Sequence, residues 1–211
     1  MVGGRGARTR GRLLDAAEAV FGQLGYHDAS IVKITEAAGV AQGTFYVYFE
    51  GKQTIFEVLV EDLNRRVRHA MATASEGGAS RIERERLGFA AFFRFTAEHP
   101  ALYRVIRQAE FVSPRVLQLH YDRIAEGYVR GLEEAMAAGE IAEADPLVEA
   151  WALMAVGEMI GMRWILWAGA DRLPAQVFDQ AMAFVARALG SGPSGGSGPS
   201  GGASASRGGS A

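Results

Sequence analysis

Apolar residues recur every three to four positions along most of the chain, which is the spacing of an amphipathic α-helix. The first such stripe begins near Thr9, ends at Gly25 and consists of Leu13, Ala17, Val20, Phe21 and Leu24. Glycine and proline separate the later stripes, and no segment alternates apolar and polar residues as a β-strand would. The pattern therefore predicts an all-α protein with about nine helices.

Composition divides the chain into four parts. Residues 1–8 are rich in Gly and Arg and contain no acid, so we expect a flexible basic arm. Residues 9–51 predict a small domain of three helices, and residues 52–189 predict a larger helical domain. Residues 190–211 contain nine Gly and seven Ser. Because such a segment has few side chains to bury, we expect it to be a disordered tail.

Residues 31–50 have the pattern of a helix-turn-helix. Apolar residues face inward from a first short helix, and Gly39 suits the left-handed conformation of a tight turn. The helix that follows begins with the small residues Ala41 and Gly43, so its backbone can approach the major groove of DNA closely. The net charge of −2 gives no general attraction to nucleic acid, and any such contact has to be local.

Several side chains of this region are candidate DNA contacts. Gln42 offers an amide that can read adenine, and Thr44 can reach a base edge, a thymine methyl group or a phosphate. Tyr46 and Tyr48 are candidates for phosphate hydrogen bonds, with packing on the next helix as the alternative for Tyr48. Lys52 lies in the first turn of that next helix, where phosphate can bind. The complete set is Ser30, Ala41, Gln42, Gly43, Thr44, Tyr46, Tyr48 and Lys52.

Residues 9–56 resemble the DNA-binding domain of the TetR family of transcriptional regulators. The matching residues are Ala16, Phe21, Gly25, Tyr26, Ile34, Ala37, Gly39, Val40, Gly43, Thr44, Tyr46, Tyr48, Phe49 and Lys52. The resemblance implies a three-helix reader, a linking fourth helix, and a helical ligand-binding and dimerisation domain whose last two helices form a homodimer. The chain departs from the family pattern at Ala29, at Ala41 and Gln42, where Ser-Lys is frequent, and at Gly51.

The larger domain combines aromatic and apolar residues with a few polar groups, which is the composition of a small-molecule pocket. The candidates are Phe89, Phe93, Tyr103, Ile106, Arg107, Tyr121, Tyr128, Met154 and Glu158. Glu158 either lines this pocket or finds a partner across a dimer. Arg104, Arg107, Arg115 and Arg123 form either a solvated face or an anion-binding rim for the phosphates of an acyl thioester. Residues 99–116 are also similar to family members that control fatty-acid or acyl-CoA metabolism.

Residues 145–169 predict one long helix of mixed large and small apolar residues. Together with the last helix, it suits a four-helix interface between two copies of the chain. The predicted protein is a homodimer that places two recognition helices on a palindromic operator, about 34–36 Å apart, and that a small hydrophobic effector releases. Repression is the family default, and activation remains open.

A dimeric helical protein that binds small molecules without operator function is the alternative. An enzyme is not predicted, because the histidines are scattered and no Gly-rich phosphate loop follows a strand. No cofactor and no metal are expected, and the absence of cysteine excludes a thiolate site. The apolar residues 150–168 include Glu158 and Arg163, which disfavours a membrane span. Without a secretory signal or a span, the expected location is the cytoplasm.

Overall fold

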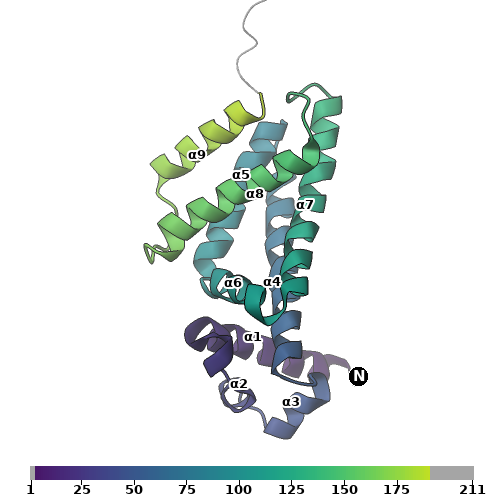
Figure 1. Cartoon of the computed structure of the whole chain (residues 1–211), viewed down its shortest axis with the longest axis vertical. Helices are drawn as coiled ribbons and strands as arrows, with labels where there is room; N and C mark the ends of the chain where they lie inside the picture. The colour runs from purple at the N-terminus through teal and green to yellow at the C-terminus, as the bar shows by residue number, and fades with distance from the viewer. Residues whose placement is uncertain (1–2, 191–211) are drawn as a thin grey trace, which may run out of the picture.

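The computed structural model describes residues 3–190, and this part of the chain contains no β-strand. Its helices are α1 (Gly3–Asp28), α2 (Ile31–Ala38), α3 (Gln42–Tyr48), α4 (Lys52–Ser75), α5 (Arg81–Glu98), α6 (Ala101–Val112), α7 (Pro114–Ala137), α8 (Pro146–Gly161), a π-helical turn (Met162–Leu166) and α9 (Ala175–Ala188). Figure 1 shows α1, α2 and α3 as a small domain at one end, joined by α4 to a larger domain of α5–α9. The predicted all-α fold is confirmed.

Helix α1 begins earlier than the sequence predicts, so the expected flexible arm over residues 1–8 is wrong for residues 3–8. Arginine is a good helix former, and the arginine side chains have partners on the small domain. The guanidinium carbon of Arg10 lies 5.4 Å from the centre of the Phe49 ring. The guanidinium of Arg12 donates to the carbonyl oxygens of Ala38 and Gly39. Arg10 and Arg12 therefore hold α1 against α2 and α3.

Two further boundaries differ from the prediction. Helix α8 ends at Gly161 and passes into the π-helical turn Met162–Leu166, so the helix expected over residues 145–169 has a wider turn near its end. The predicted tail over residues 190–211 lies outside the described residues except for Gly190. None of the described helices is both long and apolar enough to cross a membrane.

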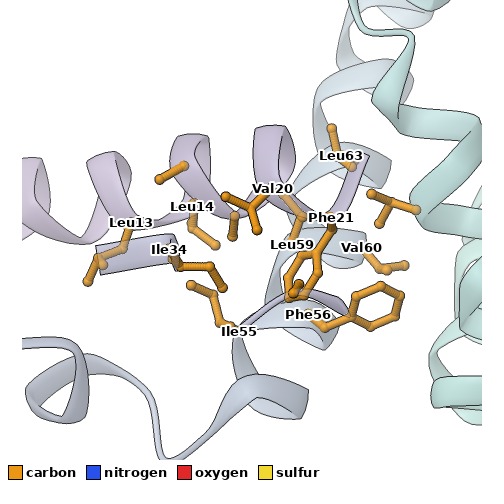
Figure 2. Close-up of a cluster of buried hydrophobic side chains, with 14 of the residues drawn as sticks. Leu13, Leu14, Val20, Phe21, Ile34, Ile55, Phe56, Leu59, Val60 and Leu63 are labelled. Carbon is orange, nitrogen blue, oxygen red and sulfur yellow. The ribbon is translucent and has the colours of Figure 1, made fainter. Parts of the chain in front are cut away.

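The core of the small domain is built from side chains of α1, α2 and α4 (Figure 2). Leu13, Phe21, Ile34 and Phe56 are fully buried, and the rings of Phe21 and Phe56 meet edge to face with their centres 5.3 Å apart. Because Phe56 belongs to α4, the first turns of this helix are part of the small domain. Its later turns pack against α5 and α7 in the larger domain. Helix α4 is thus shared by both domains.

Helix α6 is the second connection between the domains, since it packs along α1. A Cβ atom placed on Gly22 of α1 would lie only 2.6 Å from the Cβ atom of Ala101, so the two helices touch through glycine. Nearby, Arg104 Nη1 donates to the carbonyl oxygen of Gly22 over 3.0 Å. The side-chain oxygen of Gln108 accepts a hydrogen bond from the backbone N–H of Tyr26.

We expect Gly22→Ala to reduce the free energy of unfolding by about 1–3 kcal/mol, because the added methyl group forces α1 away from α6. Urea denaturation of the purified protein measures this change. Gly11→Ala on the same helix is the matched control, since nothing lies within 4 Å of its Cβ position. There the more favourable helix propensity of alanine should raise stability by about 0.5–1 kcal/mol. Equal effects at both positions would contradict the close contact.

Candidate DNA-reading surface and ligand cavity

The turn between α2 and α3 depends on Gly39, whose φ of 61° lies in the left-handed region that glycine adopts without strain. The backbone N–H of Gly39 donates to the Glu36 carbonyl over 3.0 Å, and that of Val40 donates to the Thr35 carbonyl over 3.0 Å. At the other end of α2, Ser30 Oγ accepts a hydrogen bond from the backbone N–H of Lys33. Ser30 is therefore an N-cap, and its contact with phosphate stays a prediction.

Helix α3 presents one face to solvent and buries the other. Phe45 and Phe49 are buried in the core, whereas Gln42 and Tyr46 are exposed one turn apart. Ala41 and Gly43 are exposed as well, and nothing lies within 4 Å of a Cβ atom placed on Gly43. This face is open enough for a helix backbone to enter a DNA groove, as the small residues predict.

Three other residues of α3 differ in exposure from one another. Thr44 is half-buried, at the edge of the open face. Tyr48 is half-buried against the core of the small domain, so the packing alternative describes its position. Val47 is 75% exposed on the open face, and sequence reasoning missed it. Its four-residue spacing from Gly43 is the signal that places it there.

Lys52 has hydrogen-bond partners within the protein, and its contact with phosphate stays a prediction. Its ammonium donates to the carbonyl oxygens of Tyr26 and Ala29 at 2.7 and 2.9 Å, and it lies 3.3 Å from that of His27. It also sits 4.4 Å from the centre of the Tyr26 ring. An ammonium has three hydrogens, and three carbonyls occupy them. Lys52 therefore fastens α4 to the end of α1.

A cavity of about 60 Å³ lies in the larger domain, between α4, α5, α6, α7 and α8. Of the predicted pocket residues, those that line it are Phe89, Tyr103, Ile106, Tyr121, Tyr128, Met154 and Glu158. We call this space the apolar cavity, because most of its wall is hydrocarbon. Phe93 lies elsewhere, packed edge to face against Phe178 of α9. Arg107 is exposed, and its guanidinium contacts Met162 Sδ at 3.2 Å.

The predicted anion-binding rim of four arginines does not form, because their side chains have separate partners. Arg104 reaches α1, as described above, and Arg107 contacts Met162. Arg123 Nη1 lies 3.7 Å from a carboxylate oxygen of Glu61. Arg115 is exposed at the start of α7. The solvated-face alternative describes these residues better.

Polar atoms in the apolar cavity gather around Glu158, which lines it. Tyr121 Oη donates to the Glu158 carboxylate, with oxygen–oxygen distances of 3.0 and 3.1 Å. Tyr103 Oη donates to the Glu158 carbonyl oxygen over 3.2 Å. Burial, and then the nearby negative charge of Glu158, raise the pKa of both tyrosines well above the usual value. Both phenols therefore stay protonated and act as donors at this end of the cavity.

His120 lines the apolar cavity from α7 and was not predicted from the sequence. Asn64 Nδ2 lies 3.0 Å from His120 Nδ1 and donates to the His120 carbonyl over 2.9 Å. Arg68 Nε in turn donates to Asn64 Oδ1 over 2.9 Å. Burial, followed by the charge of Arg68, lowers the pKa of His120 to about 4. The imidazole is thus neutral near pH 7, with Nδ1 as an acceptor. The one signal in the sequence was Asn64, a polar residue among the apolar positions of α4.

Helices α8 and α9 lie on the outside of the larger domain (Figure 1). They expose large apolar side chains. The exposed residues of these helices and the turn that follows α8 are Leu147, Val148, Trp151, Met159, Trp164, Trp167 and Phe184. A concentration of this size on adjacent elements is typical of a protein–protein interface. It occupies the two helices that the sequence predicts for dimerisation.

The fold combines a three-helix reader with an exposed recognition helix and a helical domain with an internal cavity, and one long helix joins them. This arrangement defines the helix-turn-helix class of DNA-binding regulators. Residues 13–59 match the family model for bacterial regulatory proteins of the tetR family. The small domain therefore carries the DNA-binding domain of that family, and the curated relatives of the chain are named as regulators.

Curated relatives match part of the chain, which spans about a third of the length of one of them. The chain is 44% identical to the uncharacterized HTH-type transcriptional regulator YdgC of Bacillus subtilis over 64 residues, which cover 30% of this chain but only 33% of YdgC. It is 29% identical to the fatty acid metabolism regulator protein of Bacillus subtilis over 137 residues, covering 63% of this chain and 70% of that protein.

Solved structures match over most of the chain. A TetR family transcription regulator from Marinobacter aquaeolei has a TM-score of 0.73 at 19% identity, with 88% of this chain and 97% of that chain covered. FadR from Bacillus subtilis, solved in complex with stearoyl-CoA, has a TM-score of 0.73 at 23% identity, with 82% and 96% covered. At these identities the structural matches establish a common fold.

Proposed function

We propose that this protein is a ligand-responsive transcriptional repressor that acts as a homodimer on a palindromic operator. Each subunit inserts α3 into a major groove, and the two copies of α3 lie about 34–36 Å apart on successive turns of the DNA. A small hydrophobic effector in the apolar cavity favours a dimer in which the two readers have the wrong spacing. The effector binds that state more tightly than the DNA-bound state, and this difference in affinity is the switch.

One observation carries the proposal: α4 contacts both the small domain of α1, α2 and α3 and the apolar cavity. Its first residue, Lys52, holds the end of α1, and its Phe56 packs in the core of the small domain. About four turns later, Val67 and Met71 of the same helix line the apolar cavity. A shift of α4 caused by ligand therefore moves the reader. The contact of α6 with α1 offers a second path, because Tyr103 and Ile106 of α6 also line the cavity.

Two further features support the dimer and the class of effector. The exposed aromatic face of α8 and α9 provides the apolar area that an isologous interface needs. The wall of the cavity is mostly apolar, which favours a hydrocarbon-rich ligand. A relative named for fatty acid metabolism and a similar fold solved with stearoyl-CoA support a fatty acyl-CoA or another lipid-like molecule.

Gel retardation with the DNA upstream of the protein's own gene tests the proposal. We expect the dimer to retard this fragment at low salt and to lose affinity steeply as salt rises, because its contacts with phosphate release counterions. A hydrophobic effector should then release the DNA. If the protein is a dimer but retards no fragment even at low salt, the operator function is wrong. The alternative of a dimeric helical small-molecule-binding protein would then hold.

A further inference from the structure

A second cavity lies between α4, α5 and α7, and six of its fourteen lining residues are basic. The basic side chains that line it are Arg65, Arg68, His69, Arg81, Arg84 and Arg130. Glu85 is the one carboxylate in the described lining, and it pairs with Arg81. Among the described residues, Arg68, Arg84 and Arg130 form no ion pair. We call this space the arginine cavity. Arg65 and Arg81 are paired with Asp62 and Glu85, whereas the other three arginines have no carboxylate partner among the described residues.

Arg81 gives the arginine cavity a buried cationic wall. It is 7% exposed, and its Nε atom has no hydrogen-bond partner among the described residues. Its guanidinium lies against Gly131 of α7, where any Cβ atom would collide with it. This Nε atom is shielded from the cavity as well as from solvent, so Arg81, paired with Glu85, contributes charge behind the wall and not a free donor.

The arginine cavity adjoins the apolar cavity. Met71, Ile124 and Tyr128 line both spaces, so these side chains form the wall between them. Met71 is unbranched and readily changes rotamer, which allows a chain to pass. A hydrogen-bonded series also crosses this wall, from Arg68 in the arginine cavity through Asn64 to His120 in the apolar cavity.

We propose that the two cavities form one site for an amphipathic anion, with a hydrocarbon chain in the apolar cavity and a phosphate-bearing head in the arginine cavity. This inference rests on the proposed function, in which the apolar cavity holds the effector. The carboxylate of Glu158 repels an anionic head from the apolar cavity, whereas the guanidinium groups attract one to its neighbour. A phosphate has three terminal oxygens and can accept paired hydrogen bonds from more than one guanidinium group. A carboxylate has only two oxygens, so it accepts fewer such bonds.

Two kinds of molecule share this chemistry: an acyl chain carried on coenzyme A and a lysophospholipid with a phosphate monoester. Isothermal titration calorimetry of the full-length, delipidated protein separates them, with palmitoyl-CoA, palmitoyl lysophosphatidate, palmitate and coenzyme A as probes below their micellar concentrations. We expect one or both phosphate-bearing lipids to bind at least about tenfold more tightly than palmitate and than coenzyme A alone. The tighter of the two identifies the source of the head.

Charge-removing variants locate the head. Arg84→Gln combined with Arg130→Gln removes a guanidinium from α5 and one from α7, on two sides of the arginine cavity. This variant should bind the preferred phosphate-bearing lipid about tenfold or more weakly and palmitate nearly as before. Arg94→Gln combined with Arg115→Gln is the control, since it removes exposed arginines from the same two helices outside both cavities. The control has the same net charge and should bind like the wild type.

A third variant, Met154→Trp, fills the apolar cavity and should weaken binding of every chain-bearing probe. The inference is overturned if the Arg84/Arg130 variant binds palmitoyl-CoA and lysophosphatidate as the wild type does. It is also overturned if no lipid binds, or if coenzyme A alone binds as tightly as palmitoyl-CoA. Gel retardation without lipid is measured separately, so loss of operator binding would contradict the proposed function and leave these affinities unaffected.

Discussion

Replacing both Gln42 and Tyr46 by alanine is expected to weaken operator binding by about 10²- to 10³-fold. Both side chains lie on the exposed face of α3, one turn apart, with the small residue Gly43 beside them. A good base contact contributes about 1–3 kcal/mol, and each is present twice in a dimer. Fluorescence anisotropy with a labelled operator fragment at fixed salt measures the change.

Stability controls make this result interpretable. Neither side chain is buried, so the thermal unfolding of the double variant should match that of the wild type. Gln23→Ala removes an exposed amide from α1 and should leave the affinity unchanged. Tyr46→Phe removes only the hydroxyl group and distinguishes a hydrogen bond to phosphate from an apolar contact. Unchanged operator affinity in the Gln42/Tyr46 double variant would show that α3 does not read DNA.

The reader was predictable from the sequence because its signals are local. The left-handed turn at Gly39 and the inward-facing Phe45 and Phe49 each follow from residue type and helical spacing. Helix spacing also placed seven of the fifteen residues of the cavity wall, since aromatic residues on facing helices converge. Helix spacing wrongly placed Phe93 in the cavity wall, because α5 is apolar on more than one side. Phe93 lies on the side of α5 that faces α9.

The contacts that could not be predicted are made by polar side chains, whose direction does not follow from helical spacing. The motif placed Lys52 beside the reader but did not reveal that its ammonium lies on the carbonyls at the end of α1. Helical spacing gave no partners for Arg10 and Arg12, which contact residues more than twenty positions away. Asn64 and His120 meet only because α4 and α7 pack together. Such contacts are set by tertiary packing rather than by sequence spacing.

The coupling between reader and effector requires a stable dimer, and the exposed face of α8 and α9 is the place to test it. Met159 and Phe184 are each more than half exposed on these helices. In an isologous interface each residue occurs twice, and burial of each such side chain contributes roughly 2 kcal/mol. Replacing apolar area by buried carboxylates reverses this contribution and adds repulsion across the symmetry axis.

We therefore expect Met159→Asp combined with Phe184→Asp to give a folded monomer whose affinity for the full operator is lower by at least about 10³-fold. A monomer binds only one half-site of the operator. It lacks the high effective concentration that dimerisation gives the second recognition helix. Sedimentation velocity measures the mass, and circular dichroism confirms the helical fold. Phe111→Asp is the control, because Phe111 is 82% exposed on α6, outside the α8–α9 face, and should remain dimeric. A dimeric Met159/Phe184 variant with wild-type operator affinity would place the interface elsewhere.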